Sequence, residues 1–304
     1  MKSARYRILH DTRYHYTAPV SLAQQLAHLW PRECPQQICH LRELLIDPEA
    51  TRRRDELDVF GNPLTRLAFE RPHESLHVRA RLDVEVLAMP KINLENSPAW
   101  EVVCHELSYS GRVLEGAALE AARYRFESPY VHLKQQFSAW ADDCFKPKRP
   151  LLAAVNALMN KLFREFTYDA AATQISTPLA QVLSEKRGVC QDFAHLMLAS
   201  LRSRGLAARY VSGYLLTQPP PGQPRLIGAD ASHAWLSVWC PKQGWVDFDP
   251  TNNIIPGVEH ITLAWGRDFG DVSPLRGVIL GGGHHDPSVS VTVMPLSEAE
   301  RLGI

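Results

Sequence analysis

The sequence lacks the features that mark several large classes of protein. Its 33 basic residues are balanced by 33 acidic ones, so no excess of positive charge predicts binding to nucleic acid or to an anionic membrane. No stretch of about eighteen apolar residues is present, and residues 1–7 lack the apolar segment of a signal peptide. We therefore expect a cytoplasmic protein with neither a nucleic-acid partner nor a membrane partner.

The sequence also lacks clustered cysteines. Its six cysteines are scattered and form no CxxC pair of the kind that binds zinc (Cys34, Cys39, Cys104, Cys144, Cys190 and Cys240). This spacing favours free thiols in a reducing compartment. His284, His285 and Asp286 are adjacent, but without further ligands nearby we interpret them as a solvated loop. We expect no metal and no cofactor.

Apolar residues alternate with polar ones in the first ninety residues, which predicts β structure. The clearest strand spans residues 76–86, and aromatic residues between positions 6 and 16 indicate an earlier strand or pair of strands. Residues 58–64 carry turn chemistry between two more strands. The basic run at 52–54 is followed at once by two acidic residues, and we interpret it as a solvated turn.

The pattern becomes helical between about residues 97 and 164, with a clear amphipathic helix over 151–163. Thr177 and Pro178 predict the start of another helix that ends at Gly188, and a further apolar-faced helix runs from Cys190 towards Gly205. Strands are expected afterwards, over 208–217, 233–240, 245–249 and 289–293, with Gly281, Gly282 and Gly283 as a flexible connection before the last.

These elements predict an α+β protein of two parts. Residues 1–90 form an N-terminal β-rich domain. Residues 91–304 hold a helical segment, a core at about 150–265 and a C-terminal β extension.

Cys190 is the cysteine with a context for chemistry. It lies in the first turn of a predicted helix, where unpaired N–H groups and the positive end of the helix dipole stabilise a thiolate. The alternative is a buried structural cysteine, because free cysteine is often found in protein interiors. The other five cysteines lack this context, and we interpret them as packing residues.

A thiolate nucleophile needs a base, and the base needs a group that orients it. His233 opens one predicted strand and Asp249 ends the next, in a hairpin with a turn at residues 241–244. A three-residue loop that pairs Cys240 with Gly244 places Asp249 opposite Trp235, on the same sheet face as His233, whereas a four-residue loop sends it to the other face. Without this context, His233 would be interpreted as a packed sheet residue.

Three motifs around these residues resemble those of the bacterial transglutaminase-like family. They are RGVCQDFAH at 187–195, SHAW at 232–235 and GWVDFDPTN at 244–252, in the family's order. The start of the chain at Tyr6 resembles the family's separate N-terminal domain, and GRDFGDV at 266–272 resembles a stretch found after its core.

The resemblance implies a papain-like α+β core in which a helix carrying the cysteine packs on an antiparallel sheet. It also implies a catalytic triad: Cys190 attacks a peptide or carboxamide carbonyl to form a thioester, His233 transfers the proton, and Asp249 orients the imidazole. The backbone N–H of Cys190 is a candidate oxyanion donor. No second donor is identified.

Several neighbouring residues are candidates for substrate contacts. Trp235, Asp192 and Gln191 are taken as substrate-binding residues, although Trp235 is as readily interpreted as core and Asp192 as a helix-capping residue. His195 lies on the same helical face as Asp192, and we favour a capping or solvated role for it. Asp247 shares a strand face with Asp249, but the DPTN match favours Asp249.

The acyl-thioester chemistry leaves three functions open. Attack by water makes the protein a cysteine protease or amidase, which we favour, and attack by an amine makes it a transglutaminase. A non-catalytic peptide-binding module on the same fold is the third, although the three intact triad positions argue against it. The expected partner is a peptide or protein substrate, and no acidic loop supports calcium regulation. The N-terminal β domain either positions a partner protein or covers one edge of the catalytic sheet.

Overall fold

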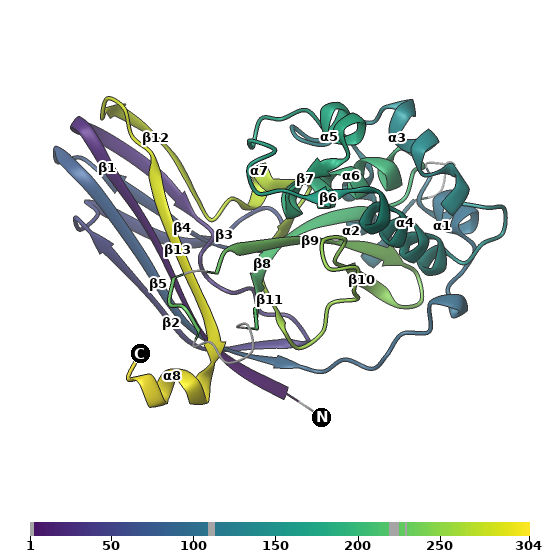
Figure 1. The fold of residues 1–304 in the computed structure, drawn as a ribbon, viewed down its shortest axis with the longest axis horizontal. Coiled ribbons are helices and arrows are strands. Elements are labelled where there is room, and N and C mark those ends of the chain that lie inside the picture. The colour runs from purple at the N-terminus through teal and green to yellow at the C-terminus, as the bar shows by residue number, and fades with distance from the viewer. Residues whose placement is uncertain (1–2, 109–112, 219–224, 229) are drawn as a thin grey trace.

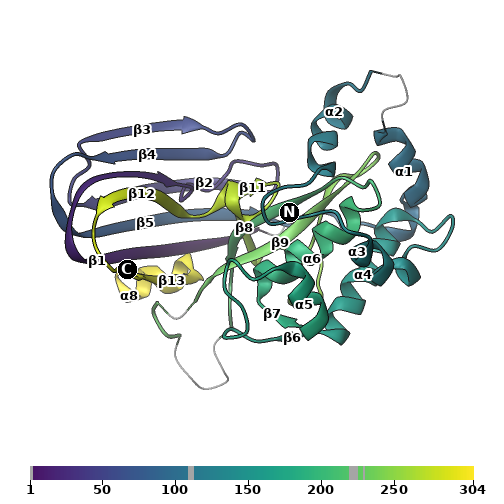
Figure 2. The same ribbon diagram turned by 90° about the horizontal axis from the view of Figure 1, so that it is seen from above.

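The computed structural model describes residues 3–108, 113–218, 225–228 and 230–304. It contains a large sheet, a smaller sheet and a set of mostly short helices (Figure 1). The large sheet lies at one side of the molecule with the C-terminal helix beside it, and most of the other helices gather around the smaller sheet at the other side (Figures 1 and 2). The predicted α+β class is confirmed. No helix of the described residues is both long enough and apolar enough to cross a lipid bilayer.

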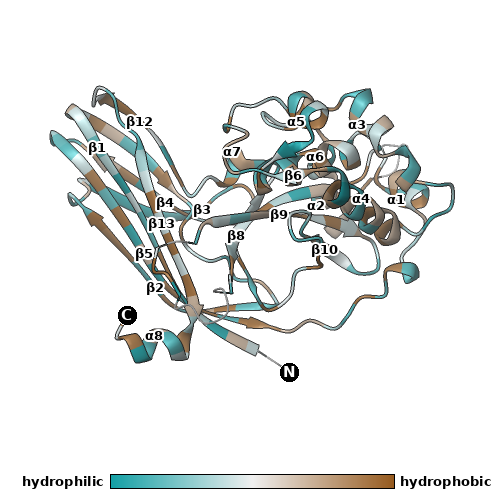
Figure 3. Ribbon diagram, in the orientation of Figure 1, coloured by the Kyte–Doolittle hydropathy of each residue, from teal (hydrophilic) through white to brown (hydrophobic). Residues whose placement is uncertain are grey.

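The large sheet joins the two ends of the chain. Its strand order is β2-β5-β1-β4-β3, and β12 and β13 also pair with β1. The strands are β1 (Ser3–Ala27), β2 (Gln37–Asp47), β3 (Arg52–Leu57), β4 (Pro63–Phe69), β5 (His73–Leu87), β12 (Leu275–Gly281) and β13 (Pro287–Pro295). Along these strands hydrophobic residues alternate with hydrophilic ones (Figure 3), as expected of a sheet with one face in the core.

The long first strand corrects two of the predictions. Its first half pairs with β5 and β13, and its second half pairs with β4 and β12. The C-terminal β extension therefore belongs to the N-terminal sheet and not to the unit at 91–304. The basic run at 52–54 lies in β3 and is not a turn. As the outermost strand in the sheet order, β3 keeps these charged side chains in solvent, which is typical of sheet edges.

Short helices lead into the core. The helices are α1 (Trp100–Leu107), α2 (Gly116–Ala122), α3 (Gln135–Trp140), α4 (Leu151–Glu165), α5 (Leu179–Glu185), α6 (Cys190–Arg202), α7 (Phe269–Val272) and α8 (Leu296–Leu302). Both predicted ends of α5 are wrong by one or two residues. Pro178 and not Thr177 occupies its N-cap, and Lys186 ends it in a left-handed conformation with φ 52°. Arg187–Gly188 then pairs as β7 with β6 (Thr167–Tyr168).

The smaller sheet carries the predicted site. Its strands are antiparallel, in the order β10-β9-β8-β11, and α6 packs against β8 and β9. They are β8 (Ala208–Leu215), β9 (Ser232–Cys240), β10 (Gly244–Phe248) and β11 (His260–Gly266). The predicted hairpin register is confirmed, because Cys240 pairs with Gly244.

Two side-chain amides join the large sheet to the edge of the smaller one. β11 is an edge strand, and Gln37 exchanges two hydrogen bonds of 2.8 Å with the backbone of Thr262. Asn62 does the same with the backbone of Trp265, at 2.8 Å and 3.0 Å. Both amides are buried. Of the two roles considered for the N-terminal β domain, the structure shows that it covers an edge of the catalytic sheet.

Candidate active site

Cys190 is the first residue of α6, and the chain before it explains why the helix begins there. Val189 is extended, and its N–H donates to Oδ2 of Asp192 at 2.9 Å, so a side chain in the first turn caps the helix. A Cβ on Gly188 would lie 2.8 Å from the same oxygen, which leaves room only for glycine. The thiol of Cys190 is half-buried at this N-terminus.

His233 and Asp249 meet as the hairpin register predicts. His233 lies at the start of β9, Asp249 follows β10, and Nε2 of the imidazole is 2.8 Å from Oδ2 of the carboxylate. The carboxylate is fully buried, and 10% of the His233 side chain is exposed. Because Nε2 is engaged by Asp249, Nδ1 is the ring nitrogen that is free for a reacting group.

The carboxylate of Asp249 has more partners than the triad supplies. Its Oδ1 accepts from the backbone N–H groups of Thr251 and Asn252 at 3.0 Å and 3.3 Å. Its Oδ2 also accepts from Nδ2 of Asn252 at 2.7 Å and from Nε2 of His260 at 3.0 Å. The sequence analysis missed His260, because a single histidine eleven residues beyond Asp249 carries no motif of its own.

The pair is charged in spite of its burial. Burial lowers the pKa of His233, but the hydrogen bond with Asp249 and the neighbouring Cys190 thiol outweigh it and raise the pKa from 6.5 to about 9. Burial also raises the pKa of Asp249, but hydrogen bonds from His233 and His260 hold it well below its usual range. The two groups are therefore an imidazolium and a carboxylate at neutral pH.

Cys190 is a neighbour of the His233 ring and contributes to the raised pKa of the imidazole. In the described part of the chain, the hydrogen bond of ordinary geometry made by the His233 ring is the one that Nε2 donates to Asp249, and Nδ2 of Asn252, itself a donor, lies 3.5 Å from the same nitrogen. The thiol and the imidazole are thus adjacent without a formed hydrogen bond. Catalytic contacts of this kind commonly tighten only when a substrate binds.

The structure corrects one of the predicted substrate contacts and reassigns another. Trp235 is fully buried, its ring packs edge-on against His260 at 5.3 Å, and its Nε1 donates to Asp247 at 3.1 Å, so it cannot reach a substrate. Asp192 is buried and accepts from Thr173 at 2.6 Å as well as from Val189, which makes it a capping residue. Gln191 is half-buried beside Cys190 and stays a prediction.

Two other polar residues that the sequence places near the triad, Asp247 and His195, have structural roles. Asp247 accepts hydrogen bonds from Trp235 and Ser237 and does not contact His233 in the described structure. His195 is buried and not solvated as predicted, because it stacks on Tyr130 and accepts the N–H of Phe269 at 3.1 Å. Burial lowers the pKa of His195 to about 3, so it is neutral at physiological pH.

Burial makes the other five cysteines poor candidates for the nucleophile. All six thiols are free. Burial raises the pKa of the remaining thiols, to about 11 in three of them (Cys34, Cys39, Cys104, Cys144 and Cys240). These groups are therefore poor nucleophiles near neutral pH.

One group of side chains has the ligand types of a metal site. One ligand atom each of His233, Asp249 and His260 lies within 4.8 Å of the others. However, both imidazoles and the amide of Asn252 donate hydrogen bonds to Oδ2 of Asp249. Hydrogen-bond donors therefore already occupy the side of the carboxylate where a cation would bind. The arrangement fits a hydrogen-bonded network better than a metal site. His284 and Asp286 form an exposed ion pair at 3.2 Å.

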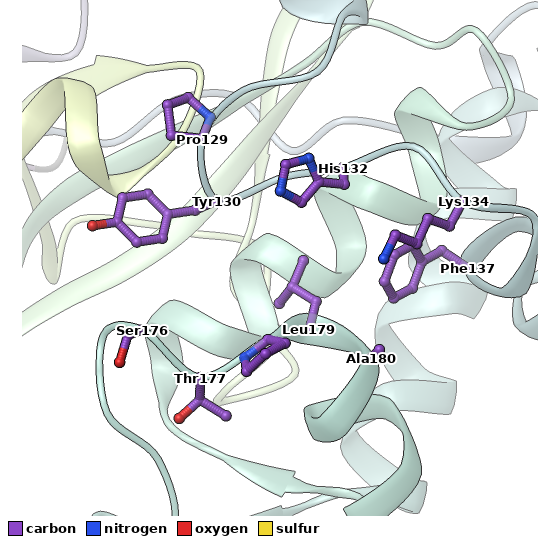
Figure 4. A pocket seen from close by; sticks show the side chains of 10 residues that line it. Pro129, Tyr130, His132, Lys134, Phe137, Ser176, Thr177, Leu179 and Ala180 are labelled. Atoms are coloured by element: carbon purple, nitrogen blue, oxygen red, sulfur yellow. The ribbon is translucent and has the colours of Figure 1, made fainter.

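A shallow pocket lies apart from the triad. Its volume is about 230 Å³. The chain leading into α3 and the chain leading into α5 line it (Figure 4). None of Cys190, His233 and Asp249 is among the lining residues, which include Tyr130, His132, Lys134 and Thr177. Nothing in this pocket bears on the chemistry of the triad.

Comparisons with known proteins agree with the motifs. Residues 6–85 match the profile of the bacterial transglutaminase-like N-terminal region, and residues 138–250 match that of the transglutaminase-like superfamily. An uncharacterized protein of Mycobacterium tuberculosis strain H37Rv is 37% identical over 299 residues, covering 96% of this chain and 93% of that protein. The chain belongs to the transglutaminase-like superfamily.

Two further proteins that are similar to this chain carry names that point to different reactions. The crystal structure of a "Putative Cysteine Protease" from Cytophaga hutchinsonii has a TM-score of 0.74 and 18% identity, and covers 97% of this chain and 92% of that one. A protein-glutamine gamma-glutamyltransferase of Pseudomonas aeruginosa is 30% identical over 161 residues, which is 48% of this chain but 24% of that protein. The first likeness confirms the transglutaminase-like fold, and the second covers too little of the enzyme to transfer its reaction.

Proposed function

We propose that the protein is a cysteine-nucleophile enzyme that hydrolyses a peptide or carboxamide bond through a thioester, with Cys190, His233 and Asp249 as its triad. One observation carries the proposal: the buried His233–Asp249 hydrogen bond of 2.8 Å leaves the other face of the imidazole beside a half-buried thiol at a helix N-terminus. The carboxylate of Asp249 stabilises the imidazolium of His233, and the imidazolium stabilises the thiolate of Cys190.

The chemistry follows from these positions. In the resting pair the proton of Cys190 is held on Nδ1 of His233, and the sulfur attacks the carbonyl carbon as a thiolate. The imidazolium then donates that proton to the leaving nitrogen, the C–N bond breaks, and an amine departs. Water attacks the thioester and gives a proton to His233, the C–S bond breaks, and a carboxylic acid leaves with the thiolate–imidazolium pair restored. Asp249 stays ionised and stabilises the imidazolium throughout.

The helix start supplies one group for the developing oxyanion. The N–H of Cys190 belongs to the first residue of α6, so it has no acceptor within the helix. We take it as the candidate donor to the carbonyl oxygen that gains charge as the sulfur attacks. In other enzymes one such donor contributes about 3 kcal/mol to transition-state stabilisation.

The first test is to trap the acyl-enzyme with an activated ester, p-nitrophenyl acetate, which needs no knowledge of the natural substrate. We expect mass spectrometry to find acetyl on Cys190 in the wild type, a burst of p-nitrophenol, and neither in Cys190→Ser. Acetylation spread evenly over the six cysteines, with no burst, would contradict the enzyme and favour a peptide-binding module.

The second step of the reaction separates hydrolysis from amine transfer. The acyl-enzyme is allowed to turn over in water with and without an added primary amine such as monodansylcadaverine. Hydrolysis predicts acetate as the main product even when the amine is abundant. A main product of acetylated amine would instead identify the protein as an acyltransferase of the transglutaminase type.

A further inference from the structure

Asp249 lies between two imidazoles that come from different strands. His233 is in β9 and His260 begins β11, with β8 between the two strands. Their Nε2 atoms lie 2.8 Å and 3.0 Å from the same oxygen of Asp249. Only His233 neighbours Cys190, so the second imidazole is not explained by the proton transfers of the proposed reaction.

The ring of His260 is held in place by its surroundings. The residue is 5% exposed, and Trp235 packs edge-on against it with ring planes at 84°. Its Nδ1 is buried and has no hydrogen-bond partner among the described residues. Nε2 lies 3.0 Å from Oδ2 of a carboxylate, which can only accept, so Nε2 is the ring nitrogen that donates. The surroundings therefore fix His260 as a donor to Asp249.

We propose that His260 is a positioning residue that fixes the carboxylate of Asp249 in the orientation the catalytic imidazole needs. This inference rests on the proposed triad. Oδ1 is held by backbone N–H groups, whereas Oδ2 is held by side chains alone, those of His233, Asn252 and His260. During the reaction His233 gains and loses a proton, so its own hydrogen bond cannot be the fixed reference for the carboxylate. His260 takes no part in proton transfer and supplies that reference.

The loss of His260 therefore acts through His233 on Cys190. Without this donor Oδ2 is no longer held in the orientation that its hydrogen bond with His233 needs, so the carboxylate stabilises the imidazolium less. The thiolate–imidazolium pair then forms over a narrower range of pH. At high pH every accessible thiol ionises without help, so the effect disappears there. A residue that only fills space would lower the stability of the fold without changing this pH profile.

The test measures iodoacetamide alkylation of Cys190 against pH in the full chain, with mass spectrometry at each cysteine. His260→Leu removes the donor and keeps the volume roughly, whereas His260→Gln places an amide N–H near the position of Nε2. At about pH 6 we expect alkylation to be at least about tenfold slower in His260→Leu and within about threefold of wild type in His260→Gln. At about pH 10 all three rates should converge.

Three results would overturn the proposal. One is a wild-type pH profile in His260→Leu, and another is a loss in His260→Gln as large as that in His260→Leu while both variants stay folded. The third is a further loss of alkylation rate when His260→Leu is added to Asp249→Asn, because the proposal expects no further effect of His260→Leu in that background. If His260→Leu does not fold, His260→Asn, whose shorter amide cannot reach Oδ2, replaces it.

The proposed triad can fail separately from this inference. A wild-type Cys190 that reacts no faster at about pH 6 than it does in His233→Ala would remove the triad itself. A reactive wild-type Cys190 whose profile ignores His260→Leu would leave the triad intact and reject only the role of His260.

Discussion

The carboxylate of Asp249 is fully buried and ionised, because donors from the backbone and from three side chains surround it. His233, whose Nε2 is 2.8 Å from the carboxylate, is charged in turn because the carboxylate raises its pKa. A buried pair of this kind stabilises the fold only while both members are charged. Its contribution to stability must therefore depend on pH.

The pH dependence has a defined direction. His233 has a pKa raised from 6.5 to about 9, so its contribution is fully present below about pH 6.5 and is lost as the pH rises through about 9. Asp249 has a lowered pKa, so its contribution is present above the ordinary value of 3.8 and is lost only in stronger acid. Between about pH 6.5 and about pH 9.5 we expect wild type to lose up to about 3 kcal/mol of unfolding free energy relative to His233→Gln.

Urea unfolding at the two pH values gives this difference directly. His284→Gln is the matched control, because its side chain is 82% exposed and should leave the wild-type pH dependence unchanged. If the free energy of unfolding changed equally between the two pH values in wild type and in His233→Gln, the His233–Asp249 pair would not be charged in the folded protein.

The hairpin of β9 and β10 could be predicted from the sequence, and the contact with β11 could not. The loop from Cys240 to Gly244 sets the hairpin register locally, and side-chain alternation then fixes which residues share the face of His233. His260 reaches Asp249 only because β11 pairs with β8 far along the chain, a contact for which no local pattern exists. The burial of Trp235 was undecided for the same reason, because it depends on what packs over the strand.

Gly213 in β8 sets the spacing between these strands. It pairs with both His233 and Thr262, and a Cβ there would overlap the carbonyl of Ile261 and approach the Trp235 ring to 2.5 Å. We expect Gly213→Ala to lower the unfolding free energy by about 2 kcal/mol or more and to slow Cys190 acylation. Gly257→Ala, with open space around the new methyl group, should change neither. A neutral Gly213→Ala would show that β8 and β11 are not held as closely as described.

Across the whole molecule, hydrogen bonds join the N-terminal sheet to the smaller sheet. The side chains of Gln37 and Asn62 satisfy the backbone of β11, and the C-terminal strands return to pair with β1. The sequence analysis predicted the last strand at 289–293 but neither β12 nor the pairing of both C-terminal strands with β1, because strand pairing between the two ends of a chain produces no local sequence pattern. The C-terminal strands therefore lie in the N-terminal sheet, and the predicted boundary at residue 90 stays a prediction.

Asn62 tests whether the edge contact matters for stability. It is fully buried, and its amide pairs with both backbone groups of Trp265. We expect Asn62→Ala to cost about 2–4 kcal/mol in urea unfolding, because it leaves two buried backbone groups without partners. Gln136→Ala, an exposed amide on α3, should stay within about 0.5 kcal/mol of wild type. A similar small effect for Asn62→Ala would mean that water replaces the amide at this edge.

The central claim is that His233 activates Cys190, and the rate of Cys190 alkylation against pH tests it most directly. We expect Cys190 of the wild type to react with iodoacetamide at about pH 6 at least about tenfold faster than the other five cysteines, whose thiols have raised pKa values, and to lose this advantage in His233→Ala. A Cys190 that reacts like an ordinary thiol, or equally well without His233, would contradict the account.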